Sequence, residues 1–413
     1  MTVQGQDFGR TANSEEAPFR FRPSRPFRYP DDFPWKGALH ARAVPVIMFK
    51  PLADQKNALS GTKGEERLFA AAQRLLALYH NLNLEPLFVI HAGLPAKELS
   101  KGHKKKGKPG GLPALACKMA LLGCRVFLLA GEREMWKALE NLVSDPVLFH
   151  PAAFPYTRRS TLCCLLELAA NSPKISHCPC SLAGPGWPIY LAKGDLASLA
   201  LGTASLDDIA RQAQDKDLLD ELSTLPQDPL QERYASLLQK SLSPEEALAL
   251  LRFLNVPERG IAHAMAVGRT AKVLAMHYIL KGEPVDEALS CAAGYVHDIA
   301  KGFGHHEKIG GHFLDFLGLS DLARCVRDHR DLVLAKDEDV SPRELVYLAD
   351  KYCFGPRFVP LERRFGMKME LFADNEKAVA GIQKRLSHAL ALEKRIRREL
   401  KKSPADIARD TLN

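Results

Sequence analysis

A histidine and an aspartate stand side by side in the second half of the chain, at the end of an apolar run. They are His297 and Asp298, and a lysine, Lys301, follows three residues after the aspartate. Adjacent side chains on a helix point about 100° apart, so one small ion lying between them can draw on both. Lys301 shares their helical face, because residues three and four apart are neighbours on a helix. An isolated histidine–aspartate pair is more often a surface ion pair than a functional site, so the surrounding residues decide between these two interpretations.

Four further residues with metal-binding side chains occur in the same half of the chain, each in or beside a helical pattern. They are His263, His306, His329 and Asp350. Imidazole together with carboxylate suits divalent Fe, Mn, Co or Zn, and carboxylate with water favours Mn or Mg. The sequence therefore predicts a site for one divalent metal ion or two. It leaves open which of the adjacent His305 and His306 is a ligand.

The order of these residues resembles the HD superfamily of metal-dependent phosphohydrolases. The resemblance covers roughly the last two fifths of the chain, and it extends to the residues that flank the candidate ligands. It implies an all-α domain that carries a metal centre. The extra histidines, His306 and His329, are of the kind found in the two-metal branch of the superfamily.

The same resemblance implies roles for the individual residues. The ligands of the first metal would be His263, His297, Asp298 and Asp350. His306 and His329 would complete a second metal site. Such ions lower the pKa of a bound water and neutralise phosphoryl oxygens. Asp298 and Lys301 would act in catalysis, with the lysine clamping the substrate phosphate or stabilising developing charge.

The length and composition indicate a two-domain cytoplasmic protein. A chain of 413 residues is too long for one ordinary core, and 46% hydrophobic with 26% charged residues is typical of globular proteins. The apolar run 114–130 contains Lys118 and Arg125, so no membrane span is expected. Residues 1–34 lack the apolar segment of a secretory signal. The lysines of the loop 97–108 have no aromatic residues between them, so nucleic acid is an unlikely partner.

The first half of the chain alternates between apolar strand patterns and amphipathic helix patterns. Strands are predicted at 44–49, 86–90, 125–130 and 146–149, and helices at 65–78, 112–122, 132–143, 160–170 and 207–222. Such alternation predicts a mostly parallel sheet that is covered by helices on both faces.

This half resembles the molybdenum-cofactor type of nucleotidyltransferase in its layout and departs from it in its chemistry. That family holds the triphosphate on a glycine-rich loop, whereas here the first strand runs into a segment that begins with Lys50 and Pro51. Pro51 offers no amide donor, and the aspartate that anchors Mg²⁺ in the family has no counterpart. We expect a degenerate domain that has lost nucleotidyl transfer, with Lys56 and Lys63 as candidate cofactor-binding residues of a rebuilt phosphate site.

The predicted fold is therefore an N-terminal α/β, Rossmann-like (nucleotidyltransferase-like) sheet domain followed by an all-α HD domain. A short helix is predicted at 231–239, and a helix that begins at Ser243 has Ser at its N-cap and Pro next to it. The expected segments are a flexible N-terminal arm at 1–42, the α/β domain at 43–222, a linker at 223–242, the HD domain at 243–402 and a C-terminal tail at 403–413.

The leading hypothesis is a metal-dependent phosphohydrolase that cleaves a phosphate ester of a nucleotide or a related small phosphorylated molecule. Two alternatives stay open. One is a nucleotide-sensing or nucleotide-binding HD module on a non-catalytic α/β scaffold. The other is a molybdenum-cofactor nucleotidyltransferase with a regulatory HD domain. The sequence does not identify the substrate, the metal or the oligomeric state.

Overall fold

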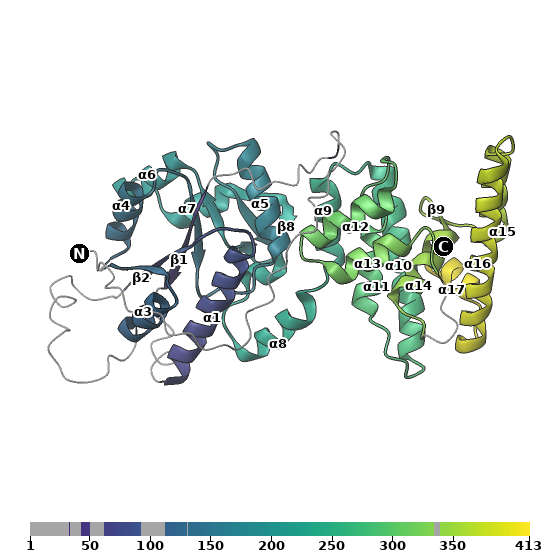
Figure 1. Ribbon diagram of the computed structural model, residues 1–413, viewed down its shortest axis with the longest axis horizontal. Helices are drawn as coiled ribbons and strands as arrows, with labels where there is room; N and C mark the ends of the chain where they lie inside the picture. Colours follow the sequence, from purple (N-terminus) through teal and green to yellow (C-terminus); the bar gives the residue numbers. More distant parts are fainter. Residues whose placement is uncertain (1–32, 34–42, 50–61, 92–111, 130, 334–338) are drawn as a thin grey trace, which may run out of the picture.

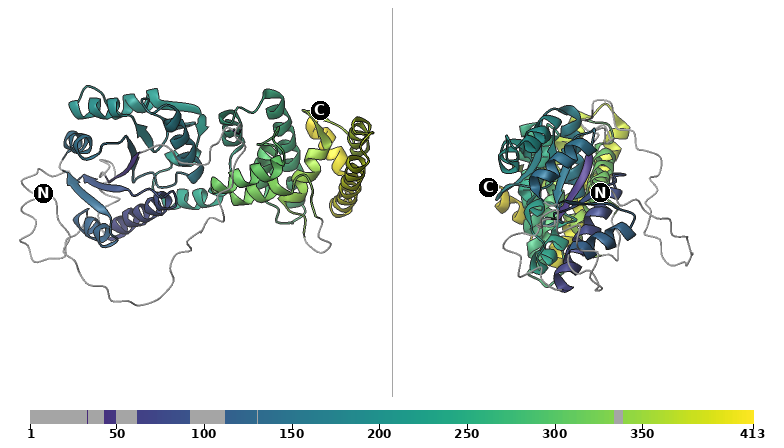
Figure 2. Two further views of the ribbon diagram at one scale, coloured as in Figure 1. Left: turned by 45° about the horizontal axis from the view of Figure 1, so that its top comes forward. Right: turned by 90° about the vertical axis from the view of Figure 1, so that its left-hand side faces the viewer.

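The chain forms an α/β half and a helix-rich half that lie end to end (Figure 1). The computed structural model describes residue 33 and residues 43–49, 62–91, 112–129, 131–333 and 339–413. Figure 2 shows the same end-to-end arrangement from a second direction. In the described part of the chain, no helix has the length and apolar character that crossing a membrane requires. The predicted order, α/β first and helical second, is confirmed.

A five-stranded sheet forms the centre of the α/β half. Its strands are β1 (Val44–Phe49), β2 (Leu87–His91), β3 (Arg125–Leu129), β4 (Val147–Pro151) and β7 (Ile189–Leu191). Their spatial order is β3-β2-β1-β4-β7, and only β7 runs antiparallel to its neighbour. The mostly parallel sheet that the sequence predicts is therefore confirmed.

Helices cover both faces of this sheet because the side chains of each strand alternate between two cores. Ile47 and Phe49 of β1 pack with α1, α3 and α5, whereas Val46 and Met48 pack with α4, α6 and α7. The helices are α1 (Thr62–His80), α3 (Leu112–Leu121), α4 (Glu132–Leu142), α5 (Arg159–Asn171), α6 (Lys193–Leu201) and α7 (Leu206–Ala213).

The helix predicted at 207–222 is wrong in its second part. The chain leaves α7 at Gln214, where the backbone becomes extended, and continues as β8 (Gln214–Leu219) and the short 3-10 helix η3 (Glu221–Thr224). β8 pairs in parallel with β5 (Cys178–Ser181), which also pairs with β6 (Gly184–Pro185). Pairing with a distant strand decides the conformation here, and the local sequence pattern carries no signal for it.

Helices dominate the second half of the chain, as predicted. They are α8 (Pro229–Leu238), α9 (Pro244–Phe253), α10 (Glu258–Ile279), α11 (Glu287–Val296), α12 (His306–Phe316), α13 (Ser320–Asp328), α14 (Pro342–Tyr352), α15 (Leu361–Leu371), α16 (Glu376–Leu400) and α17 (Pro404–Leu412). The predicted cap of α9 is confirmed, because Ser243 and Glu246 form a capping box. A small hairpin of β9 (Cys353–Phe354) and β10 (Arg357–Phe358) interrupts the helices, so the prediction of helices alone is wrong at this point.

The C-terminal residues 403–413 form a docked helix, so the prediction of a tail is wrong. Ser403 caps α17, and Pro404 occupies its first turn. Ile407 and Ala408 are buried in the core that α10, α14 and α16 share. The apolar residues of this short segment are few, which is why its sequence resembles a tail.

One residue of the predicted flexible arm at 1–42 is anchored in the helical half. Phe33 is 1% exposed and packs edge-on against Phe303, with ring centroids 5.3 Å apart, and against Phe313 at 5.8 Å. Such aromatic pairs are favourable beyond the area that they bury. The arm prediction is therefore wrong at Phe33, while residues 1–32 and 34–42 lie outside the described residues.

A buried ion cluster joins the two halves. Arg158 at the start of α5 is 3% exposed, and its Nη1 lies 2.8 Å from Asp220 Oδ1 and 2.5 Å from Glu246 Oε1. Glu246 belongs to α9 of the helical half. The neighbouring Arg159 donates hydrogen bonds of 2.8 Å to the carbonyl oxygens of Asn81 and Phe316. These contacts attach the sheet domain to α9 and to the end of α12.

Candidate metal centre

The fold brings the six predicted metal ligands together from five helices. They are His263 on α10, His297 and Asp298 directly after α11, His306 at the start of α12, His329 at the end of α13 and Asp350 on α14. Two groups of these residues have ligand atoms that all lie within 4.8 Å of one another. No third group of this kind occurs among the described residues.

A close approach of two glycines sets the distance between α10 and α11. A Cβ atom on Gly294 would lie 2.6 Å from the Cα of Gly268, so neither position accepts a side chain without a shift of the helices. Helices that meet through glycine pack more closely than ordinary side chains allow. As a result, the rings of His263 and His297 lie with their centroids 5.1 Å apart.

Glycines also set the packing of α12 against its neighbours. A Cβ atom on Gly311 would lie 2.4 Å from Arg327 Cγ of α13, and one on Gly310 would lie 2.9 Å from Ile299 Cγ2. The close packing brings the first residue of α12, His306, towards the last turn of α13. The rings of His306 and His329 have centroids 5.3 Å apart.

The first ligand group consists of His263, His297 and Asp298. Oδ2 of Asp298 lies 3.3 Å from His297 Nε2 and 3.8 Å from His263 Nε2. Asp350 adjoins this group, because its Oδ1 lies 3.2 Å from His263 Nε2 and 3.7 Å from His297 Nε2. The residues that the HD resemblance assigns to one metal therefore face a common point.

The second ligand group consists of Asp298, His306 and His329. Oδ1 of Asp298 lies 3.2 Å from His306 Nε2 and 3.5 Å from His329 Nε2. The two oxygens of Asp298 thus face different groups, Oδ2 the first and Oδ1 the second. The sequence analysis placed Asp298 with one metal only, and the geometry adds a second role for it.

The histidine rings are held in the orientation that suits metal binding. Nδ1 of three rings lies within hydrogen-bond distance of a backbone carbonyl oxygen. The distance is 3.2 Å from His263 to Gly355, 2.8 Å from His297 to Gly294 and 2.6 Å from His329 to Val326. A carbonyl only accepts, so Nδ1 carries a proton, and in the neutral ring Nε2 keeps its lone pair. Within the described part of the chain, buried His297 Nε2 and Asp298 Oδ1 have no hydrogen-bond partner. A metal ion would satisfy these atoms, so the residues fit a divalent ion.

The structure distinguishes between the adjacent candidates His305 and His306. The side chain of His305 is 74% exposed, and its Nδ1 lies 3.7 Å from Glu307 Oε1. The side chain of His306 is 17% exposed and lies against Asp298. His305 has a left-handed backbone conformation with φ of 58°, which directs the chain into α12. His306 is therefore the residue at the centre.

Two cations that the sequence analysis gave no role neutralise Asp350. Lys351 Nζ lies 2.6 Å from Asp350 Oδ2, and Arg364 Nη2 lies 3.3 Å from Oδ1. Burial acts to raise the pKa of Asp350, but Lys351 and the other neighbours outweigh it and hold this pKa well below its usual range. The Asp-Lys dipeptide is visible in the sequence, whereas Arg364 lies too far along the chain to be found by spacing.

Two further groups border the second ligand group. Glu307 is mostly buried, and its Oε2 lies 3.7 Å from His306 Nδ1 and 3.6 Å from Arg330 Nη1. Both residues directly follow a predicted ligand in sequence, Glu307 after His306 and Arg330 after His329. This adjacency was the signal that could have identified them.

Lys301 lies at the centre, as predicted. Its Nζ is 2.6 Å from Asp298 Oδ2, and its side chain is 63% exposed. The other predicted lysines cannot be placed in this way. Lys56 and the loop 97–108 lie outside the described residues, and Lys63 lies in the first turn of α1, where the structure describes no side chain.

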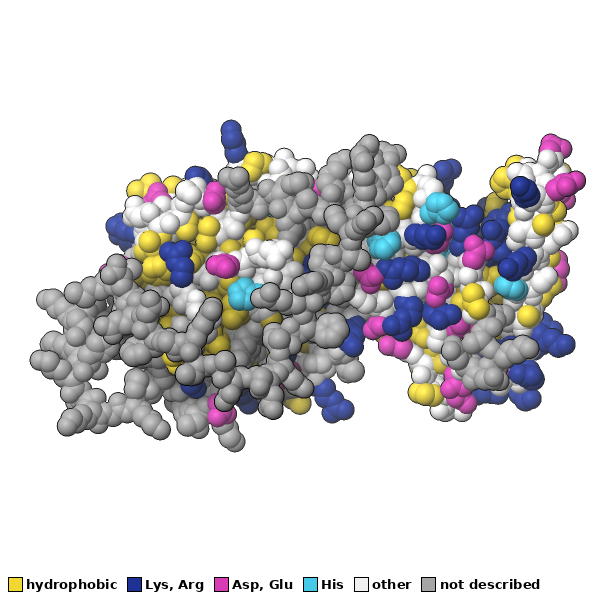
Figure 3. Space-filling view, viewed as in Figure 1, with side chains coloured by type: hydrophobic (Ala, Val, Ile, Leu, Met, Phe, Trp, Pro, Cys, Tyr) yellow, Lys and Arg dark blue, Asp and Glu magenta, His cyan; other side chains and the backbone are white. Residues whose placement is uncertain are grey.

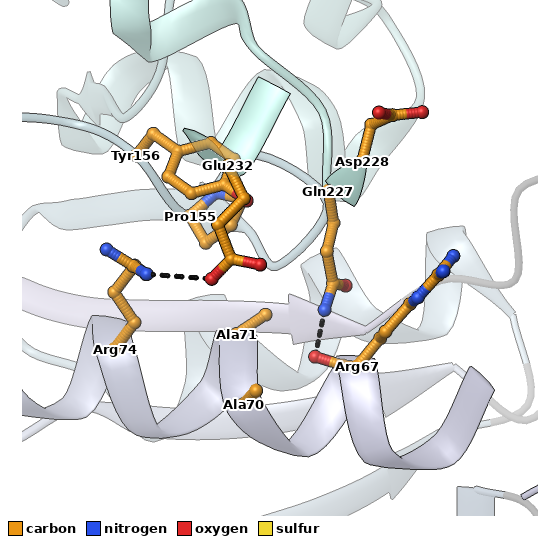
Figure 4. Close-up of a pocket in the computed structure, with 9 residues that line it drawn as sticks. All are labelled: Arg67, Ala70, Ala71, Arg74, Pro155, Tyr156, Gln227, Asp228 and Glu232. Carbon is orange, nitrogen blue, oxygen red and sulfur yellow. Dashed lines mark hydrogen bonds and ion pairs between the residues drawn. The ribbon is translucent and has the colours of Figure 1, made fainter. Parts of the chain in front are cut away.

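The α/β half contains a small pocket whose lining includes none of the candidate metal ligands (Figure 4). Its volume is about 80 Å³, and it lies between α1, the loop before α5 and the start of α8. Arg74 spans it, 3.2 Å from Glu232 and 5.1 Å from the centroid of the Tyr156 ring. This volume holds about three water molecules and is too small for a nucleotide. The pocket lies where the start of α8 approaches α1.

His329→Ala is expected to lower the metal-to-protein ratio and to leave some ion bound. The substitution removes one ligand of the second group, while the first group keeps all of its members. Elemental analysis of the purified variant measures the ratio. A ratio equal to that of the wild type would show that the second group binds no ion.

Metal uptake is expected to release protons and to weaken as the pH falls. Burial acts to lower the pKa of His297, but the Asp298 and Asp350 carboxylates outweigh it, and the pKa lies above the ordinary value of 6.5. In the metal-free fold, this ion pair stabilises the chain at low pH and is lost as the pH rises through the raised pKa. The ion needs the neutral ring, so its affinity increases over the same rise. Calorimetric titrations across this range measure the effect, and a constant affinity would contradict it.

Comparisons of this chain with protein-family models, with curated proteins and with solved structures found no match.

Proposed function

We propose that this chain is a metal-dependent phosphohydrolase that cleaves a phosphate ester of a nucleotide or a related small phosphorylated molecule. The observation that carries the proposal is the position of Asp298, whose two oxygens face two separate groups of histidine nitrogens. A carboxylate between two ion sites is suited to hold ions close enough to act on one phosphoryl group. The resemblance of the ligand order to the HD superfamily supports the same reaction.

The side chains of the centre would have different roles in hydrolysis. When bound, the metal lowers the pKa of a water and neutralises phosphoryl oxygens. His263, His297, His306 and His329 would hold the ions through Nε2. In the reaction, the water oxygen forms a bond to phosphorus, the ester P–O bond breaks, and the alcohol leaves with a proton. Lys301, which reaches Asp298 and is largely exposed, is placed to contact a phosphoryl oxygen.

The test is a hydrolysis screen over nucleotides and generic phosphate esters, with divalent metal added or chelated. We expect ester hydrolysis that requires metal and is lost in His297→Ala, since His297 belongs to the first ligand group. Thermal unfolding of the variant checks that it is folded. If the chain binds nucleotides but hydrolyses no phosphate ester in the screen, the sensory alternative replaces this proposal.

Lys301→Ala is expected to keep its metal and to lose hydrolytic rate. The loss of one electrostatic contact to developing charge costs about 100- to 1000-fold in kcat. Steady-state kinetics together with metal content measure the two effects. Lys272→Ala is the matched control, because Lys272 is a partly exposed lysine that pairs with Glu287 at 3.2 Å. A wild-type rate in Lys301→Ala would show that this lysine is structural.

We infer that the α/β half serves as a scaffold for the helical half. Support comes from Arg159, which donates to the carbonyl oxygen of Phe316, the last residue of α12. The same helix begins with the candidate ligand His306. The sheet domain is thus attached to an element that carries part of the metal centre.

A further inference from the structure

The candidate metal centre carries more cationic than anionic side chains. Its three carboxylates are Asp298, Asp350 and Glu307. In the described part of the chain, four lysine or arginine side chains pair with these carboxylates: Lys301, Arg330, Lys351 and Arg364. Arg330 also lies 4.0 Å from Asp331, which itself pairs with Arg385 at 2.7 Å. With this pair included, five positive and four negative charges leave one positive charge before any divalent ion enters. A site that already has this sign attracts anions.

Asp350 contributes little free negative charge to an ion, because two buried cations already compensate it. Lys351 and Arg364 are both at most one tenth exposed. Lys351 also donates to the carbonyl oxygen of His329 at 2.9 Å, so it is fixed between the two ligand groups. Bound ions therefore keep most of their positive charge, and a ligand has to supply the compensating negative charge.

The two exposed cations stand beside different ligand groups. Lys301 contacts Asp298 Oδ2, the oxygen that faces the first group. Arg330 is 42% exposed and lies 3.6 Å from Glu307, which itself adjoins His306 of the second group. A phosphoryl group held across both groups would meet a cation at each end. Figure 3 shows lysine, arginine and histidine side chains close together on one face of the helical half.

We propose that the centre selects a phosphoryl group with two negative charges, as in a phosphate monoester or a terminal phosphate, over the single charge of a phosphodiester. In this assignment, Arg330 is the second cation that contacts the group, opposite Lys301. The inference rests on the proposed function and specifies its substrate class. Its physical basis is that each added charge on the ligand gains attraction to the same surplus of positive charge.

Binding of phenylphosphonate, which cannot be hydrolysed at a P–O ester bond, tests this inference. The metal-loaded full chain is titrated by calorimetry with phenylphosphonate and with its monomethyl ester, in mildly alkaline buffer where the two carry two charges and one. We expect the dianion to bind more tightly by about tenfold or more. Arg330→Met is expected to weaken dianion binding by about 10- to 100-fold, the scale of one charged contact.

Two further variants make the result specific. Arg397→Met, at a similarly exposed arginine of α16 that pairs with Glu393 at 3.8 Å, should leave both affinities unchanged. Arg330→Lys should keep the preference for the dianion, which separates loss of charge from loss of fold. The inference would be overturned if the two ligands bound equally, if the monoanion bound more tightly, or if neither bound. An unchanged preference for the dianion in Arg330→Met would overturn it as well. If the chain binds metal and cleaves only diesters, the proposed function stands and this inference is wrong. If the chain prefers the dianion but cleaves neither kind of ester, the proposed function is wrong.

Discussion

Asp298→Ala is expected to weaken metal binding more than any other single substitution at the centre. One oxygen of Asp298 faces His263 and His297, and the other faces His306 and His329. Its removal takes the only shared ligand from both groups. Changing a residue that only orients a metal ligand typically lowers metal affinity or activity by about 10- to 100-fold. We therefore expect metal affinity to fall by more than about 100-fold when Asp298 is removed. Metal titration and hydrolysis assays measure the two consequences.

Asp315→Ala provides the matched control for this change. Asp315 is an aspartate of α12 that forms a partly exposed pair with Arg327. Its loss should leave metal affinity and hydrolysis near those of the wild type. Asp298→Asn keeps the size of the side chain and removes its charge, so it separates the electrostatic effect from a packing effect. Wild-type metal affinity in Asp298→Ala would contradict the shared role of this residue.

Arg158→Ala is expected to destabilise the whole chain by about 3–5 kcal/mol. The substitution leaves the buried carboxylates of Asp220 and Glu246 without the guanidinium that lies 2.8 Å and 2.5 Å from them. An uncompensated buried charge costs much more than the loss of an exposed ion pair. Because Glu246 belongs to the helical half, the effect should reach both halves. Chemical denaturation followed by circular dichroism measures the free energy of unfolding.

An exposed pair supplies the comparison for Arg158. The side chain of Arg211 is 65% exposed and lies 2.5 Å from Asp208, and Arg211→Ala should cost at most about 1 kcal/mol. A cost for Arg158→Ala that is no larger than that for Arg211→Ala would show that the buried cluster is not important for stability.

The sequence predicted the sheet well, and it identified side chains that the fold brings together, because both depend on local patterns. The strand at 44–49 has the same bounds as β1, since an apolar run between breaks identifies a buried parallel strand. The candidate ligands were visible because histidine and aspartate occur at helix ends in a recognisable order. The structure adds that their Nε2 and carboxylate atoms converge.

The features that the sequence missed depend on contacts between distant residues. Gly268 and Gly294 are ordinary helix glycines in the sequence, and only the crossing of α10 and α11 shows why a side chain does not fit there. Arg364 reaches Asp350 from a different helix. β8 takes its conformation from pairing with β5. None of these contacts has a period or a spacing that local pattern analysis can read.

The shared role of Asp298 is tested most directly by anomalous X-ray scattering from crystals of the metal-loaded protein. Data collected on both sides of the absorption edge of the bound metal locate each ion. The geometry predicts an ion within roughly 2 Å of Asp298 Oδ2, on the side of His263 and His297, and where a second ion is bound, one at the same distance from Oδ1 on the side of His306 and His329. Anomalous peaks that lie elsewhere, or the absence of any peak beside Asp298, would contradict the central claim.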